Sequence, residues 1–256
     1  MVVLVSVAAP ATPGGNLADR VLRLLERVDY RRAETAEERE AIFRLRYEAY
    51  LREGAIAGNA SHRFADPLDE ASNAWIFGVH IDGELASSIR LHVASRQSPD
   101  LPALGVFSDL LSPEIAAGKT VIDPTRFVAD RTASRRFPEL CYVTTRLAWL
   151  ASEYFQTSLL LATVRAEHQA FYRRVFGHRL ICDPRHYPSL AKPISLMALD
   201  YAMARERVPQ RYPFFRSTFF ERRMMFERLQ EPVKTAEHLR APLRVIGPAA
   251  PARKVL

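Results

Sequence analysis

Residues 121–130, VIDPTRFVAD, have the apolar ends of a buried β-strand but a centre that buried strands rarely contain. Asp123, Pro124 and Arg126 stand among residues that favour strands. A proline removes a donor from the hydrogen-bond ladder and is usually confined to edges or bulges. A buried charge is costly unless it finds a partner. We therefore expect a strand that Pro124 distorts and separates from a neighbour, with both charged side chains facing a cleft.

The chain before this stretch alternates helical and strand patterns. Residues 35–54 are the clearest helix, because Thr35 and Glu38 match a capping box and Gly54 stops the pattern. Two β-rich runs around Asp82-Gly83 predict a β-hairpin over 73–95. The other expected elements are a helix at 16–28, a short strand at 29–33 and a Pro- and Leu-rich connection at 96–120.

The chain after this stretch predicts a mixed sheet. The patterns are a helix at 137–155, a strand at 158–164, a helix at 167–177 and strands at 178–187 and 191–201. A helix between two strands makes them parallel, whereas hairpins make antiparallel pairs. We expect an α+β fold in which a twisted, mostly antiparallel sheet is flanked by helices.

The C-terminal part differs in composition. Residues 211–230 mix arginine with phenylalanine and methionine, which predicts an added amphipathic helix. Docking on the domain is the ordinary interpretation, and a surface for a carrier protein or membrane is the alternative. Residues 231–256 are expected to be loosely ordered. The expected divisions are an N-terminal arm and helix (1–28), a main domain (29–201), and a C-terminal helix with a basic tail (202–256).

Composition excludes some classes of protein. A net charge of +7 over 256 residues favours an acidic partner without choosing among nucleic acid, membrane, protein and phosphorylated substrate. Cys141 and Cys182 lie far apart, so we expect no disulfide framework and no metal site. Residues 1–15 lack the basic start of a secretory signal, and no apolar run approaches about 20 residues. A cytoplasmic location is expected.

Four stretches place charge where the patterns favour apolar residues. They contain Arg46, then Asp66 and Asp69, then Arg90, and finally the strand quoted above. Taken singly, Arg46 fits an arginine reaching solvent from the edge of a core, and the aspartates fit turn positions. Together they suggest one network around a cleft, because buried arginines need carboxylate partners and these are present in matching number. Separate surface ion pairs are the alternative.

In this order the motifs resemble the autoinducer-synthase branch of the acetyltransferase-like (GNAT) fold. The matching motifs are Arg-x-x-Ala-Tyr (46–50), Asp-x-x-Asp (66–69), Arg-Leu (90–91) and DPTRF (123–127). The chain is most similar to the N-acyl amino acid synthases, often called FeeM-type, and residues 159–180 resemble the strand–helix–strand that closes these folds. The resemblance covers about residues 29–200. The lactone synthases have a tryptophan after the first motif, which this chain lacks, so their substrate class is disfavoured.

The resemblance implies an acyltransferase in which an amine attacks the thioester of a long acyl chain. The donor would be acyl carrier protein with its 4′-phosphopantetheine, without a bound cofactor, and the acceptor an amino acid or similar small amine. The expected substrate-binding residues are Arg46, Tyr50, Asp66, Asp69 and Arg90, and Arg46 or Arg90 would bind a substrate carboxylate in a forked pair.

The expected catalytic groups lie in the quoted strand. Asp123 is the candidate base, with Arg126 beside it, and backbone N–H groups near Phe127 and Val128 are expected to stabilise the oxyanion. The family usually has glutamate at Asp123, so the shorter side chain favours a relay through water. A local ion pair between Asp123 and Arg126 that only fixes the strand is the alternative.

The donor is predicted from the next loop, residues 129–137, which carries Arg131, Arg135 and Arg136 but no glycine. Acetyltransferases that use coenzyme A hold its pyrophosphate with a glycine-rich loop. The arginines suit a phosphopantetheine phosphate or an acidic carrier protein, although a plain solvated loop also explains them.

Two other functions remain open at this point. One is an acyl-coenzyme A-dependent N-acetyltransferase of the same fold. The other is a non-catalytic basic module that binds nucleic acid or membrane. The second is disfavoured because no nucleic-acid motif is present. We therefore expect no nucleic-acid partner and leave peripheral membrane contact open.

Overall fold

The computed structural model describes residues 15–187 and 192–228. The expected N-terminal arm and the basic tail at 231–256 lie outside the described residues. None of the helices in the described ranges combines the length and hydropathy needed to cross a membrane.

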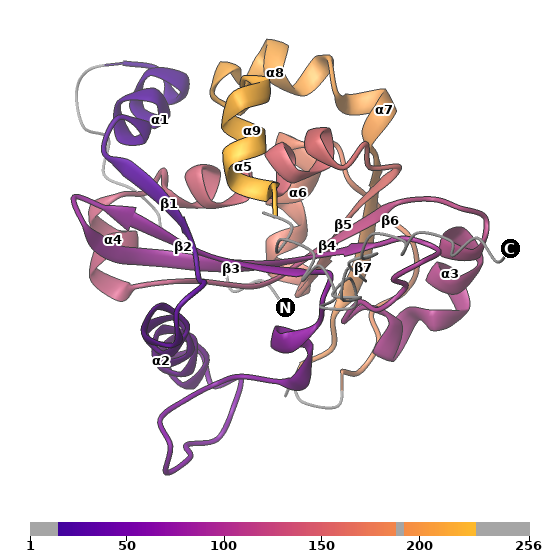
Figure 1. The fold of residues 1–256 in the computed structure, drawn as a ribbon, viewed down its shortest axis with the longest axis horizontal. Helices are drawn as coiled ribbons and strands as arrows, with labels where there is room; N and C mark the ends of the chain where they lie inside the picture. Colours follow the sequence, from indigo (N-terminus) through magenta and orange to yellow (C-terminus); the bar gives the residue numbers. More distant parts are fainter. Residues whose placement is uncertain (1–14, 188–191, 229–256) are drawn as a thin grey trace, which may run out of the picture. The chain divides into compact units, whose positions relative to one another are not determined.

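The described chain forms a seven-stranded sheet (Figure 1). Its strands are β1 (Val28–Arg32), β2 (Ala74–Ile81), β3 (Glu84–Ala94), β4 (Val121–Ala129), β5 (Leu159–Val164), β6 (Arg179–Leu180) and β7 (Ser195–Asp200). Their order across the sheet is β1-β2-β3-β4-β5-β7-β6. Among the strands of the described residues, β4 and β5 alone pair in parallel, and the other neighbours pair antiparallel. The predicted mixed, mostly antiparallel sheet is confirmed, although β6 is much shorter than the expected strand.

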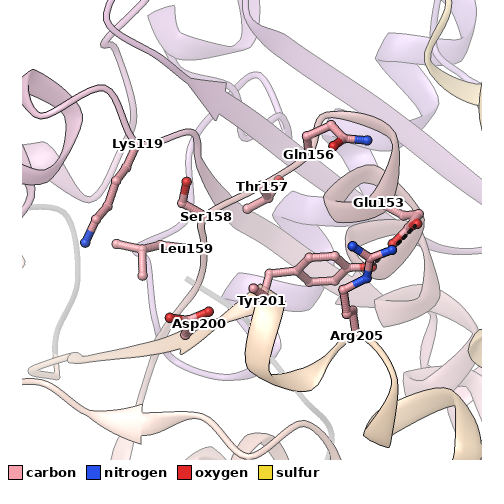
Figure 2. A pocket seen from close by; sticks show the side chains of 10 residues that line it. Lys119, Glu153, Gln156, Thr157, Ser158, Leu159, Asp200, Tyr201 and Arg205 are labelled. Carbon is pink, nitrogen blue, oxygen red and sulfur yellow. Dashed lines mark hydrogen bonds and ion pairs between the residues drawn. The ribbon is translucent and has the colours of Figure 1, made fainter.

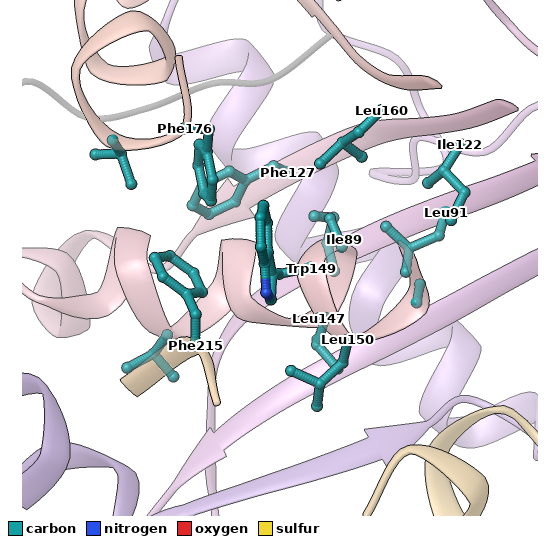
Figure 3. Close-up of a cluster of buried hydrophobic side chains, with 14 of the residues drawn as sticks. Ile89, Leu91, Ile122, Phe127, Leu147, Trp149, Leu150, Leu160, Phe176 and Phe215 are labelled. Carbon is teal, nitrogen blue, oxygen red and sulfur yellow. The ribbon is translucent and has the colours of Figure 1, made fainter. Parts of the chain in front are cut away.

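Helices cover both faces of this sheet (Figure 1). One face carries α1 (Leu17–Leu25), α5 (Leu140–Tyr154), α6 (Gln169–Val175) and α9 (Phe219–Phe226), and the other carries α2 (Ala36–Arg52) and α3 (Leu104–Ala116). In the core on the first face, Trp149 of α5 stacks near Phe176 and Phe215, with ring centroids 5.9 and 5.8 Å away (Figure 3). The two faces therefore have separate cores.

Local signals explain the elements that the sequence predicts well. The Thr35 side chain accepts a hydrogen bond from Glu38 N, which completes the capping box of α2. Asp82 and Gly83 both have positive φ, as a two-residue hairpin turn between β2 and β3 requires. Both elements are confirmed.

Helix α3 and a second, shorter helix lie in segments that were expected to be a connection and a loop. The connection at 96–120 contains α3, which has no side-chain cap, holds Pro113 inside and is kinked at Phe107. Tertiary burial of Phe107, Leu111 and Ile115 explains it. The supposed loop at 129–137 contains the short helix α4 (Arg131–Arg136), and Asp130 caps it by accepting from Ala133 N.

The prediction of one continuous helix over 211–230 is wrong. The described part of that range holds the 3₁₀ turn η3 (Pro213–Phe215) and α9, and two short helices, α7 (Tyr201–Ala204) and α8 (Arg207–Arg211), come before it. Pro213 cannot continue the helix from α8. Docking is confirmed, because Phe214, Phe215 and Phe226 are buried and Arg146 of α5 donates to Phe214 O at 2.6 Å. The domain divisions at residues 28 and 201 stay a prediction.

Candidate active site

A β-bulge interrupts β4 at the charged stretch. In the register with β3, Ser88 faces Val128 and Arg90 faces Thr125, so Arg126 and Phe127 together stand opposite one residue. Arg126 has φ +53°, a left-handed conformation that is uncommon for arginine. The bulge turns the neighbouring Thr125 and Arg126 side chains toward the same group of charges, although neighbours on a regular strand point to opposite faces.

The parallel pair β4–β5 separates directly after its first two residues. Val121 and Ile122 pair with β5, whereas β5 stays paired with β7 along its whole length. Pro124 has no N–H to contribute to a ladder. The predicted separation of β4 from a neighbour is confirmed, and it leaves the edge of β4 beyond Ile122 without a β5 partner.

Five side chains form one charge cluster, which we call the arginine cluster: Arg46, Asp66, Asp69, Arg90 and Arg126. All are buried except Asp66, which is partly exposed. Arg46 Nη1 and Arg90 Nη1 lie 2.7 and 2.9 Å from Asp69 Oδ1. Arg90 Nη1 also lies 2.7 Å from Asp66 Oδ1, and Arg126 pairs with Asp66 Oδ2. Arg46 and Arg90 are 0 and 1% exposed, so the surface ion-pair and solvent-reaching interpretations are wrong for them. The predicted ion-pair network is confirmed, and the cleft around it stays a prediction.

A 3₁₀ turn, η1 (Pro67–Glu70), presents both carboxylates. Asp66 begins the turn and accepts from Leu68 N at 3.0 Å, while Asp69 Oδ2 accepts from Asp66 N at 2.9 Å. His92 of β3 and Arg39 of α2 bind the turn's carbonyls from outside, at Leu68 O (3.0 Å) and Asp69 O (2.8 Å). The turn is thus held by the sheet and by α2 together.

Burial and neighbouring charges shift the pKa values of side chains in the arginine cluster. Burial alone would raise the pKa of Asp66, but Arg90 and Arg126 hold that pKa far below its usual range. Burial lowers the pKa of Arg46 to about 10 despite the attraction of Asp69. Three cations face two carboxylates, and Arg46 Nε and Nη2 have no partner among the described residues. Among the described residues the cluster therefore carries one more cation than carboxylates and two unpaired donors.

Tyr50 and Phe64 surround the third arginine. Arg126 Cζ lies 5.5 Å from the Tyr50 ring centroid and 4.4 Å from that of Phe64. Tyr50 is fully buried. The structure thus places the Tyr50 ring against the Arg126 guanidinium of the arginine cluster.

Asp123 is buried beside the cluster but does not belong to it. Its Oδ2 accepts from Ala103 N at 2.9 Å and its Oδ1 from Thr163 Oγ1 at 3.3 Å. Among the described residues it makes no ion pair with Arg126, so the local ion-pair alternative is wrong. Burial raises the pKa of Asp123 to about 6. This carboxylate can exchange a proton near neutral pH.

Two further polar side chains share the cluster's face and were not predicted. His92 stands opposite Asp123 in the register of β3 with β4, and Ser88 stands opposite Val128. With Arg90 they occupy alternate positions of β3, which a strand places on one face. Once Arg90 is assigned to the site, the two-residue period of a strand predicts from the sequence that Ser88 and His92 share its face.

The remaining predicted residues lie outside the arginine cluster. Arg131, Arg135 and Arg136 are exposed on α4, directly after β4. Phe127 and Val128 are buried in the two cores on either side of the sheet. The role of their backbone N–H groups in stabilising an oxyanion stays a prediction.

A polar cavity of about 380 Å³ lies elsewhere, where β5 begins and β7 ends (Figure 2). Tyr201 donates to Glu153 at 2.6 Å on one side of it, and Lys119 and Asp200 lie on the other. No member of the arginine cluster lines this cavity. In the described residues no group of His, Cys, Asp and Glu could hold a metal ion.

Comparisons with known proteins fit this geometry. The model of a family described as N-acyl amino acid synthase FeeM matches residues 41–200. The solved structure of FeeM, an N-acyl amino acid synthase from uncultured soil microbes, has a TM-score of 0.60 and 20% identity, covering 71% of this chain and 94% of that chain. BjaI, a CoA-dependent acyl-homoserine lactone synthase solved with SAM and isopentyl-CoA, has a TM-score of 0.50 and 13% identity, covering 73% of this chain and 89% of that chain.

At these identities the two structures show a shared fold, and the GNAT-like fold prediction is confirmed. No curated protein matches the chain.

Proposed function

Because the chain belongs to the N-acyl amino acid synthase FeeM family and is an amide-forming acyltransferase, we propose that it transfers a long acyl chain from acyl carrier protein to the amine of an amino acid. Membership of this enzyme family excludes the non-catalytic binding module. The observation that carries the proposal is the buried arginine cluster beside the point where β4 leaves β5.

The cluster supports an acceptor that carries a carboxylate. Its three arginines exceed its two aspartates, and Arg46 has two unpartnered nitrogens. A substrate carboxylate would balance the charge and satisfy buried donors in a forked pair. An amine without a carboxylate would leave both needs unmet, so an amino acid is the better acceptor.

Asp123 supports the chemistry. With a pKa of about 6, it is mostly ionised at neutral pH and can take a proton from the ammonium group of the acceptor, directly or through a water molecule. The unpaired edge of β4 beyond Ile122 is where a thioester can lie against the strand. In this proposal the N–H groups near Phe127 and Val128 stabilise the oxyanion.

The donor is proposed from the exposed arginines of α4. Arg131, Arg135 and Arg136 give the end of β4 a positive surface, which attracts an acidic carrier protein. Acyl-coenzyme A is the second candidate, because the chain shares its fold with BjaI, which is described as CoA-dependent and was solved with isopentyl-CoA. Peripheral membrane contact through the exposed Phe219 and Phe220 of α9 remains a prediction.

The test is acyl transfer by the purified protein. Acyl carrier protein and coenzyme A thioesters of equal chain length are each supplied with a panel of amino acids and with amines that lack a carboxylate, at two ionic strengths. We expect N-acyl amino acids by mass spectrometry, a preference for the carrier-bound donor, and weaker use of it at high salt. If the coenzyme A thioester is used as well as the carrier-bound one and salt has no effect, acyl-coenzyme A is the better candidate for the donor. Equal acylation of amines without a carboxylate would contradict the role of the arginine cluster.

A further inference from the structure

Buried polar atoms without a partner gather on one face of β3. In the described part of the chain they include Ser88 Oγ and His92 Nδ1. Arg46 of α2, which pairs with Asp69 in the arginine cluster, adds Nε and Nη2. Buried polar atoms are nearly always hydrogen-bonded in folded proteins. Several such atoms around the same charge cluster therefore point to a ligand that completes them.

Among these atoms, His92 Nδ1 is the basic nitrogen that can accept a proton. His92 is fully buried, and its Nε2 lies 3.0 Å from Leu68 O. A carbonyl oxygen only accepts, so Nε2 carries the hydrogen and Nδ1 carries the free lone pair. Burial lowers the pKa of His92 to about 4, which keeps the ring neutral at pH 7. The contact with η1 fixes both the tautomer and the direction of the ring.

The surroundings of His92 are those of the reaction site. Asp123 stands opposite it on β4, Arg90 lies two residues away on the same strand, and Asp66 and Asp69 face it from η1. Both Asp123 oxygens already accept hydrogen bonds, from Ala103 N and Thr163 Oγ1. His92 Nδ1 accepts none from the described residues.

The proposed reaction removes two protons from the attacking nitrogen. An amino acid arrives as an ammonium with three N–H bonds, and the amide keeps one. One proton must leave before attack, because the nitrogen needs a lone pair. The other leaves while the C–N bond forms and the C–S bond breaks, and it ends on the departing sulfur. Asp123 serves the first transfer in the proposed function, and a neutral base near the same nitrogen would relay the second proton to the sulfur.

We propose that His92 Nδ1 is this neutral base, receiving the hydrogen bond and then the proton of the attacking amine and passing the proton to the thiolate. The transfer consumes no oxidant or further reactant, since the thioester and ammonium become amide, thiol and one released proton. This inference rests on the proposed function and adds a catalytic residue to it.

The test separates the lone pair of Nδ1 from the structural contact of Nε2. In His92→Gln the amide nitrogen can still donate to Leu68 O, but no basic nitrogen remains. His92→Asn is too short for that contact. His80→Gln, on β2, is the matched control because it replaces a histidine outside the site. Circular dichroism and melting accompany kcat and KM for the best amino acid acceptor.

We expect His92→Gln to melt like the wild type, to keep its KM and to lose about 100-fold or more in kcat. His92→Asn should be equally slow, and His80→Gln unchanged. If His92 only holds η1, His92→Gln should stay active and His92→Asn should be impaired. A kcat of His92→Gln near the wild-type value would therefore overturn the proposal.

A second acceptor substrate distinguishes the two proton transfers. Aminooxyacetate carries a weakly basic nitrogen that is already neutral at pH 7, so it does not need the first transfer. We expect it to restore much of the turnover of Asp123→Asn and none of that of His92→Gln. Restoration of both variants would refute a separate role for His92. If the wild-type protein acylates no amine from either thioester, the proposed function itself fails, whatever the variants do.

Discussion

Replacing Asp69 by asparagine tests how far the fold depends on the arginine cluster. Asparagine keeps the size of the side chain and an oxygen that can accept from Asp66 N, but it removes the charge. Arg90 retains Asp66 at 2.7 Å, whereas Arg46 loses the only carboxylate that it contacts among the described residues. The perturbation therefore isolates one fully buried guanidinium.

Removing one partner of a buried ion pair costs about 3–5 kcal/mol, because the other charge stays buried without compensation. Domains of this kind have total stabilities of about 5–15 kcal/mol. For a chain of this size, 1 kcal/mol lowers the melting temperature by about 2–4 °C, so Asp69→Asn should melt roughly 6–20 °C lower. Thermal and urea unfolding followed by circular dichroism measure this.

Two control variants separate the loss of the buried charge from other effects of the substitution. Asp82→Asn removes an exposed pair with Arg27 in a turn that tolerates asparagine, and it should leave the melting temperature unchanged. Arg46→Met removes the isolated cation, so Asp69→Asn should cost much less in that background. An Asp69→Asn protein that melts like the wild type, or an equal loss with and without Arg46, would show that the charge is not the cause.

The remaining predictions concern titration, donor docking and the C-terminal helix. The folded-state pKa of Asp123, about 6, lies above the ordinary 3.8. Its contribution to stability is therefore present below about pH 4 and lost as the pH rises through about 6. Asp123→Asn should remove this loss, so unfolding titrations should show the variant gaining about 2 kcal/mol on the wild type from pH 4 to 7, while its acyl transfer stays low throughout. Charge reversal at Arg135 and Arg136 should raise the KM for the carrier-bound donor more than it lowers kcat, and steady-state kinetics at high salt should shrink the difference; unchanged kinetics would contradict carrier docking at α4. Phe226→Ala, at a side chain 2% exposed, should cost about 3–5 kcal/mol in urea unfolding, whereas Phe220→Ala, 70% exposed, should change stability by less than about 0.5 kcal/mol. Equal effects would mean that α9 does not dock through Phe226.

Elements with their own start and stop signals could be predicted from the sequence. The capping box at Thr35 and the Asp82-Gly83 turn act within a few residues, so α2 and the hairpin follow from local chemistry. Helix α3 has no such signal, because no side chain caps it and Pro113 argues against it. It exists because its apolar side chains are buried against the sheet, which is a tertiary cause.

The arginine cluster could be predicted as a set of residues but not as pairs. Buried arginines require carboxylates, so the number and kind of charges were sufficient for the set. The partner of Arg126 depends on the bulge, which turns its side chain onto the face of Thr125 and toward a carboxylate 60 residues earlier in the chain. No local pattern encodes that register. The strand's own proline was the visible sign that β4 departs from regular geometry.

The turn η1 connects binding with chemistry in this site. Its two carboxylates hold three arginines, and its Leu68 carbonyl orients His92. A change in the turn must therefore alter the charge offered to a substrate carboxylate and the direction of the His92 lone pair at the same time. Arg39, which binds the turn from α2 through Asp69 O, touches neither function directly. Because the turn couples them, loss of Arg39 should raise the KM for the amino acid and lower kcat together, whereas His92→Gln should change kcat alone. Comparing these two patterns tells whether the turn acts as one positioning element or as two independent contacts.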